Sequence, residues 1–266
     1  MIRKKLIGCV YNEKSDNCHI AATTLTQKYP NIECVHLQDL QYASKNYQCI
    51  ITIGGDGLML KVLHQLVDNP IDIYGINLGS IGFLLNDYSD SDILTSIANA
   101  NRAILHPLEM RVTDSQGMQH TALAINEVSI MRQTCQTAKL QIKIDGKIRL
   151  DHLTADGVLL STPAGSTAYN SAVGGPIVPL NADVLLLTPI SVFRPRRWSG
   201  AVLASNSVVE FTNLAPTKRP INAVADSVEI QNVVHTHVIE RKDICMTILF
   251  DKHNSLQERI LKEQFE

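Results

Sequence analysis

Asp56 is a candidate catalytic residue, because this carboxylate lies within the glycine-rich run Gly54-Gly55-Asp56-Gly57. An apolar run from Cys49 to Ile53 precedes this loop, and a second begins at Leu58. A glycine loop at a helix N-terminus exposes backbone N–H groups and is a ready site for phosphate. Because a carboxylate beside phosphate is repelled unless a metal ion or a transferring proton lies between them, Asp56 points to phosphoryl transfer. The motif alone is also consistent with a tight turn whose aspartate caps a helix.

A second polar pair, Asn126-Glu127, is set between apolar residues at 124–125 and Val128. An asparagine amide can pair with one edge of adenine, and a glutamate can accept hydrogen bonds from ribose hydroxyls. The alternative is a turn or hairpin edge at the end of a strand. Taken alone, the pair favours that alternative.

The third segment runs from Asp156 to Pro179, DGVLLSTPAGSTAYNSAVGGPIVP. Its small hydroxyl residues and glycines allow close backbone approach and adaptable hydrogen bonds. Tyr169 can lie flat against a base or nicotinamide ring, and Asp156 can bond a sugar hydroxyl. A long loop without secondary structure of its own is usually functional, so we predict a binding loop here rather than a structural connection.

The glycine loop lies in a pattern of alternating strands and helices over the first hundred residues. We expect strands at Lys5–Val10, Ile32–Leu37, Cys49–Ile53 and Ile71–Ile76, and helices at Ser15–Tyr29, from Leu58 onward and at Ser89–Ala100. This alternation predicts a parallel sheet with right-handed crossovers. Ligands of such sheets bind beyond the carboxyl ends of the strands, where the glycine loops at 54–57 and 79–82 both lie.

After Arg102 the pattern changes to strands alone. They are expected at Ala103–Val112, His120–Met131, Lys139–Ile144, Lys147–Leu150, Gly157–Ser161, Val184–Leu187, Ser207–Phe211 and Val233–Ile239. The sequence thus predicts an N-terminal α/β domain with a parallel sheet over residues 1–102 and a mostly-β, sandwich or prism-like domain over 103–250. An amphipathic helix at Leu256–Phe265 closes the chain, and we expect residues 251–266 to pack back on the first domain or on a partner subunit.

Composition narrows the function classes. With 266 residues, 45% hydrophobic and 19% charged, the chain is typical of a globular protein. A net charge of −2 gives no electrostatic case for nucleic acid or an anionic membrane surface, and no apolar stretch is long enough to span a bilayer. Six scattered cysteines without a Cys-x-x-Cys pair indicate reduced, mostly buried thiols in a cytoplasmic protein, and argue against a redox or zinc role.

Together these motifs resemble the NAD kinase family over most of the chain. The resemblance covers the loop at 54–57, the run from Gly75 to Leu84 (GINLGSIGFL), Asn126-Glu127, and residues 156–176. Leu186-Leu-Thr-Pro-Ile190 also fits. Diacylglycerol kinases and phosphofructokinases carry a similar glycine loop, so the specific signal is the ordered set of motifs rather than that loop.

The resemblance implies a reaction as well as a fold. Members of the family have an N-terminal α/β domain and a C-terminal all-β domain. They transfer the terminal phosphate of ATP, or in some members of polyphosphate, to the 2′-hydroxyl of the adenosine ribose of NAD, making NADP. They need a divalent cation, usually Mg²⁺, and form homodimers or homotetramers. We therefore expect a cytoplasmic phosphotransferase with ATP as co-substrate.

Carried over residue by residue, the resemblance makes Asp56 the proton acceptor for the ribose hydroxyl. Gly54, Gly55 and Gly57 become the phosphate-donor loop. The implied NAD contacts are Asp56, Gly57, Asn126, Glu127, Asp156, Thr167, Ala168, Tyr169 and Ala172. No protein side chain is assigned as a direct metal ligand.

The chain departs from the family pattern at several positions. Thr154 stands where many members have a basic residue, Ala172 where many have serine (Ser171 is adjacent), and Ala225-Asp226-Ser227 where many read Asp-Gly. The usual Pro-His stretch after Ile190 is replaced by SVFRPRRW, residues 191–198. These departures concern substrate contacts and the choice of phosphate donor, not the reaction class.

Arg194, Arg196 and Arg197 in that replaced stretch are candidate phosphate ligands. Stacking on Trp198, or pairing at a surface or subunit interface, is the more ordinary role for them.

Two other functions are compatible with parts of the sequence. A lipid or sphingoid-base kinase would share the glycine loop, but Asn126-Glu127 and the lack of an obvious membrane-binding helix argue against it. A dinucleotide-binding sensor without turnover would share the fold, but the retained Asp56 argues against that. Catalytic zinc and a serine hydrolase are disfavoured, because the histidines lack metal-ligand spacing and Gly165-Ser166-Thr167 is not a nucleophile elbow.

Overall fold

The computed structural model describes residues 6–79, 82–89 and 92–252. The chain divides into two compact units, the first made of residues 1–105 and 244–266 and the second of residues 106–243. The helix expected at 256–265 lies outside the described residues.

The first unit is built on a sheet to which seven strands contribute among the described residues. These are β1 (Leu6–Tyr11), β2 (Ile32–Cys34), β3 (Tyr47–Gly54), β4 (Asp72–Asn77), β5 (Asn86–Asp87), β6 (Asn101–Leu105) and β18 (Met246–Phe250). The order is β2-β1-β3-β4-β18-β6, with β5 also beside β4. All pairs are parallel except that of β18 with β6. The expected parallel sheet is confirmed, with one antiparallel edge strand.

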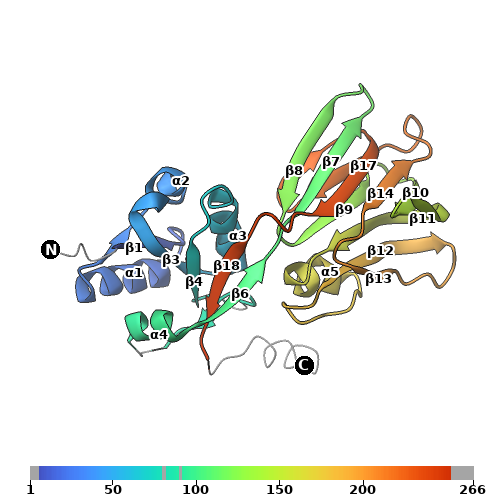
Figure 1. Cartoon of the computed structure of the whole chain (residues 1–266). Helices are drawn as coiled ribbons and strands as arrows, with labels where there is room; N and C mark the ends of the chain where they lie inside the picture. The colour runs from blue at the N-terminus through green and yellow to red at the C-terminus, as the bar shows by residue number, and fades with distance from the viewer. Residues whose placement is uncertain (1–5, 80–81, 90–91, 253–266) are drawn as a thin grey trace. The chain divides into compact units, whose positions relative to one another are not determined.

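Helices connect and cover these strands (Figure 1). They are α1 (Asp16–Lys28), α2 (Leu40–Ala43), α3 (Asp56–Gln65) and α4 (Ile93–Asn99), with single 3₁₀ turns η1 (Leu37–Asp39) and η2 (Ser44–Asn46). Helix α1 begins after Ser15, whose hydroxyl accepts the N–H of Cys18, and ends ahead of Pro30. Helix α4 begins later than expected because Asp92 caps it, accepting the N–H of Thr95.

The predicted division of the chain needs correction at both boundaries. The segment expected as one strand, Ala103–Val112, is two strands, β6 and β7 (Leu108–Asp114), which belong to different sheets. Pro107 separates them, and its missing N–H interrupts a strand ladder. Residues 244–250, expected in the β domain, include β18, which lies between β4 and β6 in the first unit. The second strand is also shorter than expected and ends at Cys34 rather than Leu37.

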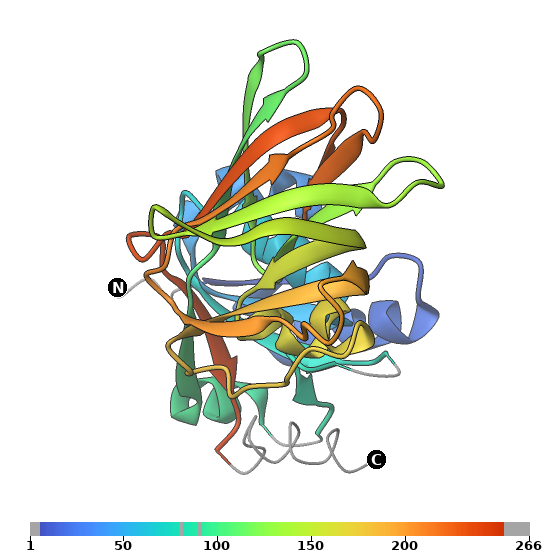
Figure 2. The same ribbon diagram turned by 90° about the vertical axis from the view of Figure 1, so that its right-hand side faces the viewer.

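The second unit contains one antiparallel sheet of eleven strands within residues 106–243 (Figure 2). Besides β7 they are β8 (Gln119–Ala124), β9 (Glu127–Arg132), β10 (Ala138–Ile144), β11 (Lys147–Ser161), β12 (Val184–Arg194), β13 (Ala201–Ala204), β14 (Val209–Asn213), β15 (Ile221–Ala225), β16 (Val228–Ile230) and β17 (Val233–Glu240). The main order is β16-β15-β9-β11-β10-β14-β17-β7-β8, with β12 beside β11 and β13 beside β12. This confirms the mostly-β second domain.

Two of the expected strand boundaries in the second unit were wrong in an informative way. The run His120–Met131 breaks into β8 and β9 at residues 125–126, so Asn126-Glu127 lies at the start of β9. Lys147–Leu150 and Gly157–Ser161 are instead parts of the single long strand β11. After β11 the chain forms a short 3₁₀ turn, η3 (Ala164–Thr167), and a short helix, α5 (Tyr169–Ala172). The predicted loop therefore has secondary structure of its own.

Candidate active site

Asp56 is the first residue of α3, directly beyond the carboxyl end of β3. Its Oδ2 accepts the backbone N–H of Phe83 at 2.9 Å, and its Oδ1 accepts that of Leu84 at 2.9 Å. The carboxylate is therefore oriented by a turn from a different part of the chain, and it does not cap its own helix: the N-cap is Gly55, without a side-chain cap.

Two of the three glycines beside Asp56, Gly55 and Gly57, leave room next to the backbone. Among the described residues, a Cβ added at Gly55 or Gly57 would meet nothing within 4 Å, and one at Gly54 would approach Leu58 at 3.1 Å. None of the three has a positive φ. The expected sharp glycine turn is thus not a left-handed one, and the glycines matter here as open space beside the first N–H groups of α3. Such space suits the close approach of a phosphate.

In the second unit, Asp226 fixes the backbone of the Asn126-Glu127 pair. Asp226 lies between β15 and β16 with φ 48°. Its carboxylate accepts the N–H of Ile125 at 2.7 Å, of Asn126 at 3.0 Å and of Glu127 at 3.3 Å. One carboxylate thus satisfies three successive amides that start β9.

The side chains of this pair have acceptor atoms with no partner within the part of the chain that the structure describes. Asn126 Oδ1 and Glu127 Oε2 are both buried and form no hydrogen bond there. Burial, and then the negative charge of Asp226, raise the pKa of Glu127 to about 7. A buried acceptor without a donor is costly, so the two atoms mark a place where a ligand's donors would be stabilising.

The loop after β11 packs against the same backbone. Thr162 donates its hydroxyl to the carbonyl of Ile125 at 2.6 Å, and its N–H to the carbonyl of Asn126 at 2.9 Å. A Cβ at Gly165 would collide with the carbonyl of Asn126. The loop can therefore approach the Asn-Glu pair this closely only with glycine at 165.

Asn170 anchors the rest of this loop. Its amide nitrogen donates to the carbonyls of Pro176 at 2.9 Å and Ser166 at 3.3 Å, and its Oδ1 accepts the hydroxyl of Thr188 at 2.6 Å. Asn170 is fully buried, and a Cβ at Gly175 would collide with its amide. This side chain ties η3, α5 and the Gly175-Pro176 turn to β12.

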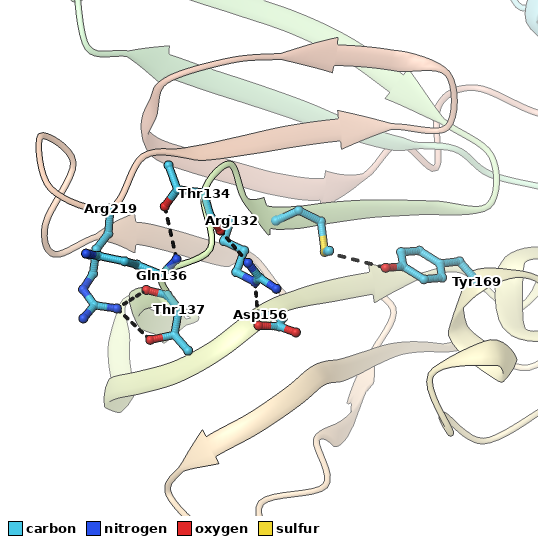
Figure 3. Close-up of polar contacts among 8 residues, drawn as sticks. Arg132, Thr134, Gln136, Thr137, Asp156, Tyr169 and Arg219 are labelled. Atoms are coloured by element: carbon cyan, nitrogen blue, oxygen red, sulfur yellow. Dashed lines mark hydrogen bonds and ion pairs between the residues drawn. The ribbon is translucent and has the colours of Figure 1, made fainter.

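Asp156 and Tyr169 each contact a side chain of β9 (Figure 3). Arg132 of β9 donates its Nε–H to Asp156 Oδ1 at 2.6 Å, and the Tyr169 hydroxyl contacts Met131 Sδ at 3.6 Å. The pKa of Tyr169 is raised by burial and then by the negative charges of Glu127 and Asp156. The structure thus brings Glu127, Asp156 and Tyr169 into one electrostatic neighbourhood.

The remaining predicted residues are less closely involved. Thr167 and Ala168 are partly buried beside Tyr169, while Ala172 is exposed at the end of α5. Arg194, Arg196 and Arg197 are exposed. Within the described segments none of the three stacks on Trp198.

Sequence reasoning missed three residues of this region: Asp226, Arg132 and Asn170. Asp226 was noticed only as a departure from a family pattern, and its contacts join residues about 100 positions apart. Arg132 stands opposite Asp156 only because β9 pairs with β11. A polar residue directly after Tyr169, in a loop dense with glycine, was the available signal for Asn170.

Two features are absent from the described residues. Over the described ranges, no helix is long and apolar enough to cross a membrane. In the same ranges no three His, Cys, Asp or Glu side chains are grouped so as to hold a metal ion.

Known proteins match both units. The ATP-NAD kinase N-terminal domain family matches residues 12–102, and the ATP-NAD kinase C-terminal domain family matches residues 125–240. Two solved structures share the fold. A yeast NADH kinase complexed with NADH has a TM-score of 0.82 at 20% identity, covering 98% of this chain and 88% of that one. An NAD kinase from Archaeoglobus fulgidus in complex with ATP has a TM-score of 0.76 at 21% identity, covering 96% and 97%. Fold and domain matches together define a kinase, a phosphotransferase.

Curated relatives narrow the class further. The NAD kinase of Caulobacter vibrioides is 52% identical over 221 residues, 83% of this chain and 85% of that protein. The NAD kinase of Rickettsia felis is 48% identical over 259 residues, 97% of each. This chain belongs to the NAD kinase family.

Proposed function

We propose that the protein phosphorylates the 2′-hydroxyl of the adenosine ribose of NAD with ATP, making NADP and ADP. The observation that carries the assignment is the pair of buried, unpartnered acceptors, Asn126 Oδ1 and Glu127 Oε2. Adenine offers an amino group and ribose offers hydroxyls, which are the donors that these two atoms lack. Family membership supplies the reaction class, and these atoms fit its nucleoside acceptor.

Asp56 is the proposed general base. The ribose 2′-oxygen attacks the γ-phosphorus of ATP, the bond from that phosphorus to the β–γ bridging oxygen breaks, and the hydroxyl proton passes to Asp56. The N–H groups of Phe83 and Leu84 hold the carboxylate in one orientation, and a carboxylate held in place can act as a general base for a hydroxyl brought within hydrogen-bond reach. Phosphoryl transfer asks mainly for such positioning and for charge neutralisation.

The phosphate donor is proposed to lie against the loop at 54–57. The open space at Gly55 and Gly57 admits phosphate oxygens to the N–H groups that begin α3. Polyphosphate has the same terminal chemistry, so a parallel assay with it decides between the donors.

A divalent cation, Mg²⁺, fits this donor set only as a partner of the substrate phosphates. Mg²⁺ typically binds through one or two carboxylates, water and substrate phosphates. Asp56 is the carboxylate at the start of α3, beside the loop. The bound ion would neutralise charge on the phosphates, while Asp56, Gly55 and Gly57 position them.

The NAD adenosine is proposed to be held by the second unit. Asn126 and Glu127 take the base and ribose, Tyr169 covers a ring, and Asp156 bonds a sugar hydroxyl. The loop residues Thr167, Ala168 and Ala172 complete the proposed contacts. The Arg132–Asp156 ion pair keeps one oxygen of Asp156 occupied and orients the other.

Calorimetric titration with NAD tests the acceptor site. Asn126→Ala and Glu127→Ala should each weaken NAD binding at least tenfold, because each removes an acceptor for the nucleoside. Ser227→Ala, an exposed neighbour of Asp226, should leave it unchanged. Unchanged NAD affinity in both site variants would overturn the assignment.

The enzyme is further proposed to work as a homodimer or homotetramer, as the resemblance implied. Light scattering on the purified protein would give its mass in solution, and a monomer across the micromolar range would contradict this proposal.

A further inference from the structure

Two cysteines far apart in the sequence face each other at the edge of the first sheet. Cys9 of β1 and Cys34 of the edge strand β2 are direct register partners in the parallel ladder. Side chains of register partners project from the same face of a sheet. Neighbouring strands lie about 4.8 Å apart, and disulfides join Cα atoms separated by roughly 4.4–6.8 Å. The backbone therefore already holds the two residues at a separation that a disulfide can span.

The two thiols differ in access, as in an exchange pair. Cys34 is exposed, whereas Cys9 is fully buried among the residues under α1. A hydrogen bond with Cys9, and to a smaller extent the nearby His36, lower the pKa of Cys34 to about 7. The same contact with Cys34, and then burial, raise the pKa of Cys9. The exposed Cys34 is thus the thiol that more readily becomes a thiolate, the nucleophilic form, while Cys9 stays protonated.

We propose that Cys9 and Cys34 form a thiol–disulfide exchange site, which a low-molecular-weight disulfide of the glutathione type oxidises to an intramolecular disulfide. This runs against the sequence-based expectation of redox-inert cysteines. That expectation rested on the missing Cys-x-x-Cys motif, which cannot detect a pair brought together by strand pairing.

The chemistry balances in two steps. The Cys34 thiolate attacks one sulfur of the small disulfide, forming a mixed disulfide and releasing one thiolate. Cys9 then loses its proton, and its sulfur attacks Cys34 Sγ, forming the Cys9–Cys34 bond and releasing the second thiolate. Two protein thiols are oxidised and the small disulfide is reduced to two thiols. The new bond would tie the edge strand β2 to β1.

The test uses the full chain with Cys135→Ser and Cys245→Ser, which removes the other two exposed cysteines. The protein is incubated with oxidised glutathione at neutral pH and examined by intact mass and peptide mapping. We expect a mass lower by two hydrogen atoms, one cross-linked peptide pair containing Cys9 and Cys34, and full reversal by a dithiol reductant. Thermal unfolding of the oxidised form should shift upward by several degrees, because the bond closes a loop around α1.

Two variants on this background separate the steps. With Cys9→Ser the reaction should stop at one glutathione on Cys34, and with Cys34→Ser neither adduct nor cross-link should form. The background protein alone keeps the test decisive if either variant fails to fold. A stable glutathione adduct on Cys34 with Cys9 still free, or no reaction at Cys34, would overturn the proposal.

Discussion

At the scale of single residues, two aspartates accept backbone N–H groups in a similar way, but only one of them could be predicted from the sequence. Asp56 accepts N–H groups from Phe83 and Leu84, and Asp226 accepts them from residues 125–127. Asp56 could be predicted as a site residue, because its glycine neighbours and the apolar runs on either side are local. Asp226 could not, because its partners are distant in sequence and its importance comes from the turn that places it beside them.

Asp226→Asn should raise KM for NAD about tenfold while changing kcat by less than threefold. The substitution replaces charge-assisted hydrogen bonds with weaker ones and turns an N–H₂ group toward backbone donors, so the Asn126-Glu127 backbone loses its orientation. Steady-state kinetics with Ser227→Ala as the matched control would measure this. Equal KM values in the two variants would show that Asp226 does not position the pair.

Glu127 should make stability and NAD binding depend on pH. Its pKa rises from 4.5 to about 7 in the folded protein, so the folded state holds the proton more tightly than the unfolded state does. The associated stability is present below pH 4.5 and is lost as pH rises through 7. Glu127→Gln should therefore be more stable than the wild type near pH 8, on the order of 2 kcal/mol, and similar to it near pH 5.

Urea unfolding at the two pH values, with the exposed Asp151→Asn as control, tests that statement. A Glu127→Gln difference that does not vary with pH would refute it. Wild-type NAD affinity should also fall as pH drops below 7, because a protonated Glu127 has less acceptor capacity. The NAD affinity of Glu127→Gln should not show this fall.

At the scale of elements, a substitution at the start of α3 should stabilise the helix and yet weaken the binding of ATP. Gly57→Ala adds a methyl group into open space and should stabilise the helix by about 0.5–1 kcal/mol. It should nevertheless raise KM for ATP at least tenfold, because the methyl group occupies space proposed for phosphate. Lys61→Ala, an exposed position on the same helix, is the control for thermal unfolding and kinetics. Unchanged KM for ATP in Gly57→Ala would remove the loop from the donor site.

The loop between β11 and β12 should depend on Asn170 for its shape. Asn170→Ala leaves the Thr188 hydroxyl and two carbonyls without their partner, at a cost of about 2–4 kcal/mol. Urea unfolding should show this loss, and KM for NAD should rise as Tyr169 loses its support. Exposed Asn181→Ala in the same unit is the comparison. If the two variants were equally stable, Asn170 would not anchor the loop.

The elements also show what the sequence could and could not specify. Local signals predicted α1 and β3, because a capping serine, a following proline and a run of β-branched residues act within a few positions. The break at Asn126 was missed because β8 and β9 read as one apolar alternation, whereas the turn between them is held by residues distant in sequence, among them Asp226 and Thr162. The continuity of β11 was likewise decided by its pairing with β10 and β12.

At the scale of the whole molecule, the chain returns to its first unit after completing the second. Strand β18 pairs with both β4 and β6, and Ile248 at its centre is fully buried. The Asn86 amide donates to the carbonyl of Leu249 at 2.9 Å and to that of Gly75 at 3.0 Å. No pattern near residue 246 reveals this placement, because it follows from which sheet has room for another strand.

A chain ending at Asp243 should therefore lose the fold of its first unit, although every predicted site residue precedes that point. Hydrogen exchange should show lost amide protection in β3 and β4 and retained protection in β9 and β11. A chain ending at Lys252, which keeps β18, should retain amide protection in β3 and β4. Normal protection of β3 and β4 in the shorter chain would contradict the role given to β18.

The proposed reaction can be measured in one assay, in which the purified protein is incubated with NAD, ATP and Mg²⁺ and NADP is measured by mass spectrometry. Asp56→Asn is run in parallel, with its fold checked by thermal unfolding and its NAD affinity by calorimetry. We predict NADP from the wild type alone, with NAD affinity of the variant within a few-fold. NADP from both proteins would show that Asp56 is not the general base. No NADP from the wild type, with ATP or with polyphosphate, would contradict the proposed reaction itself.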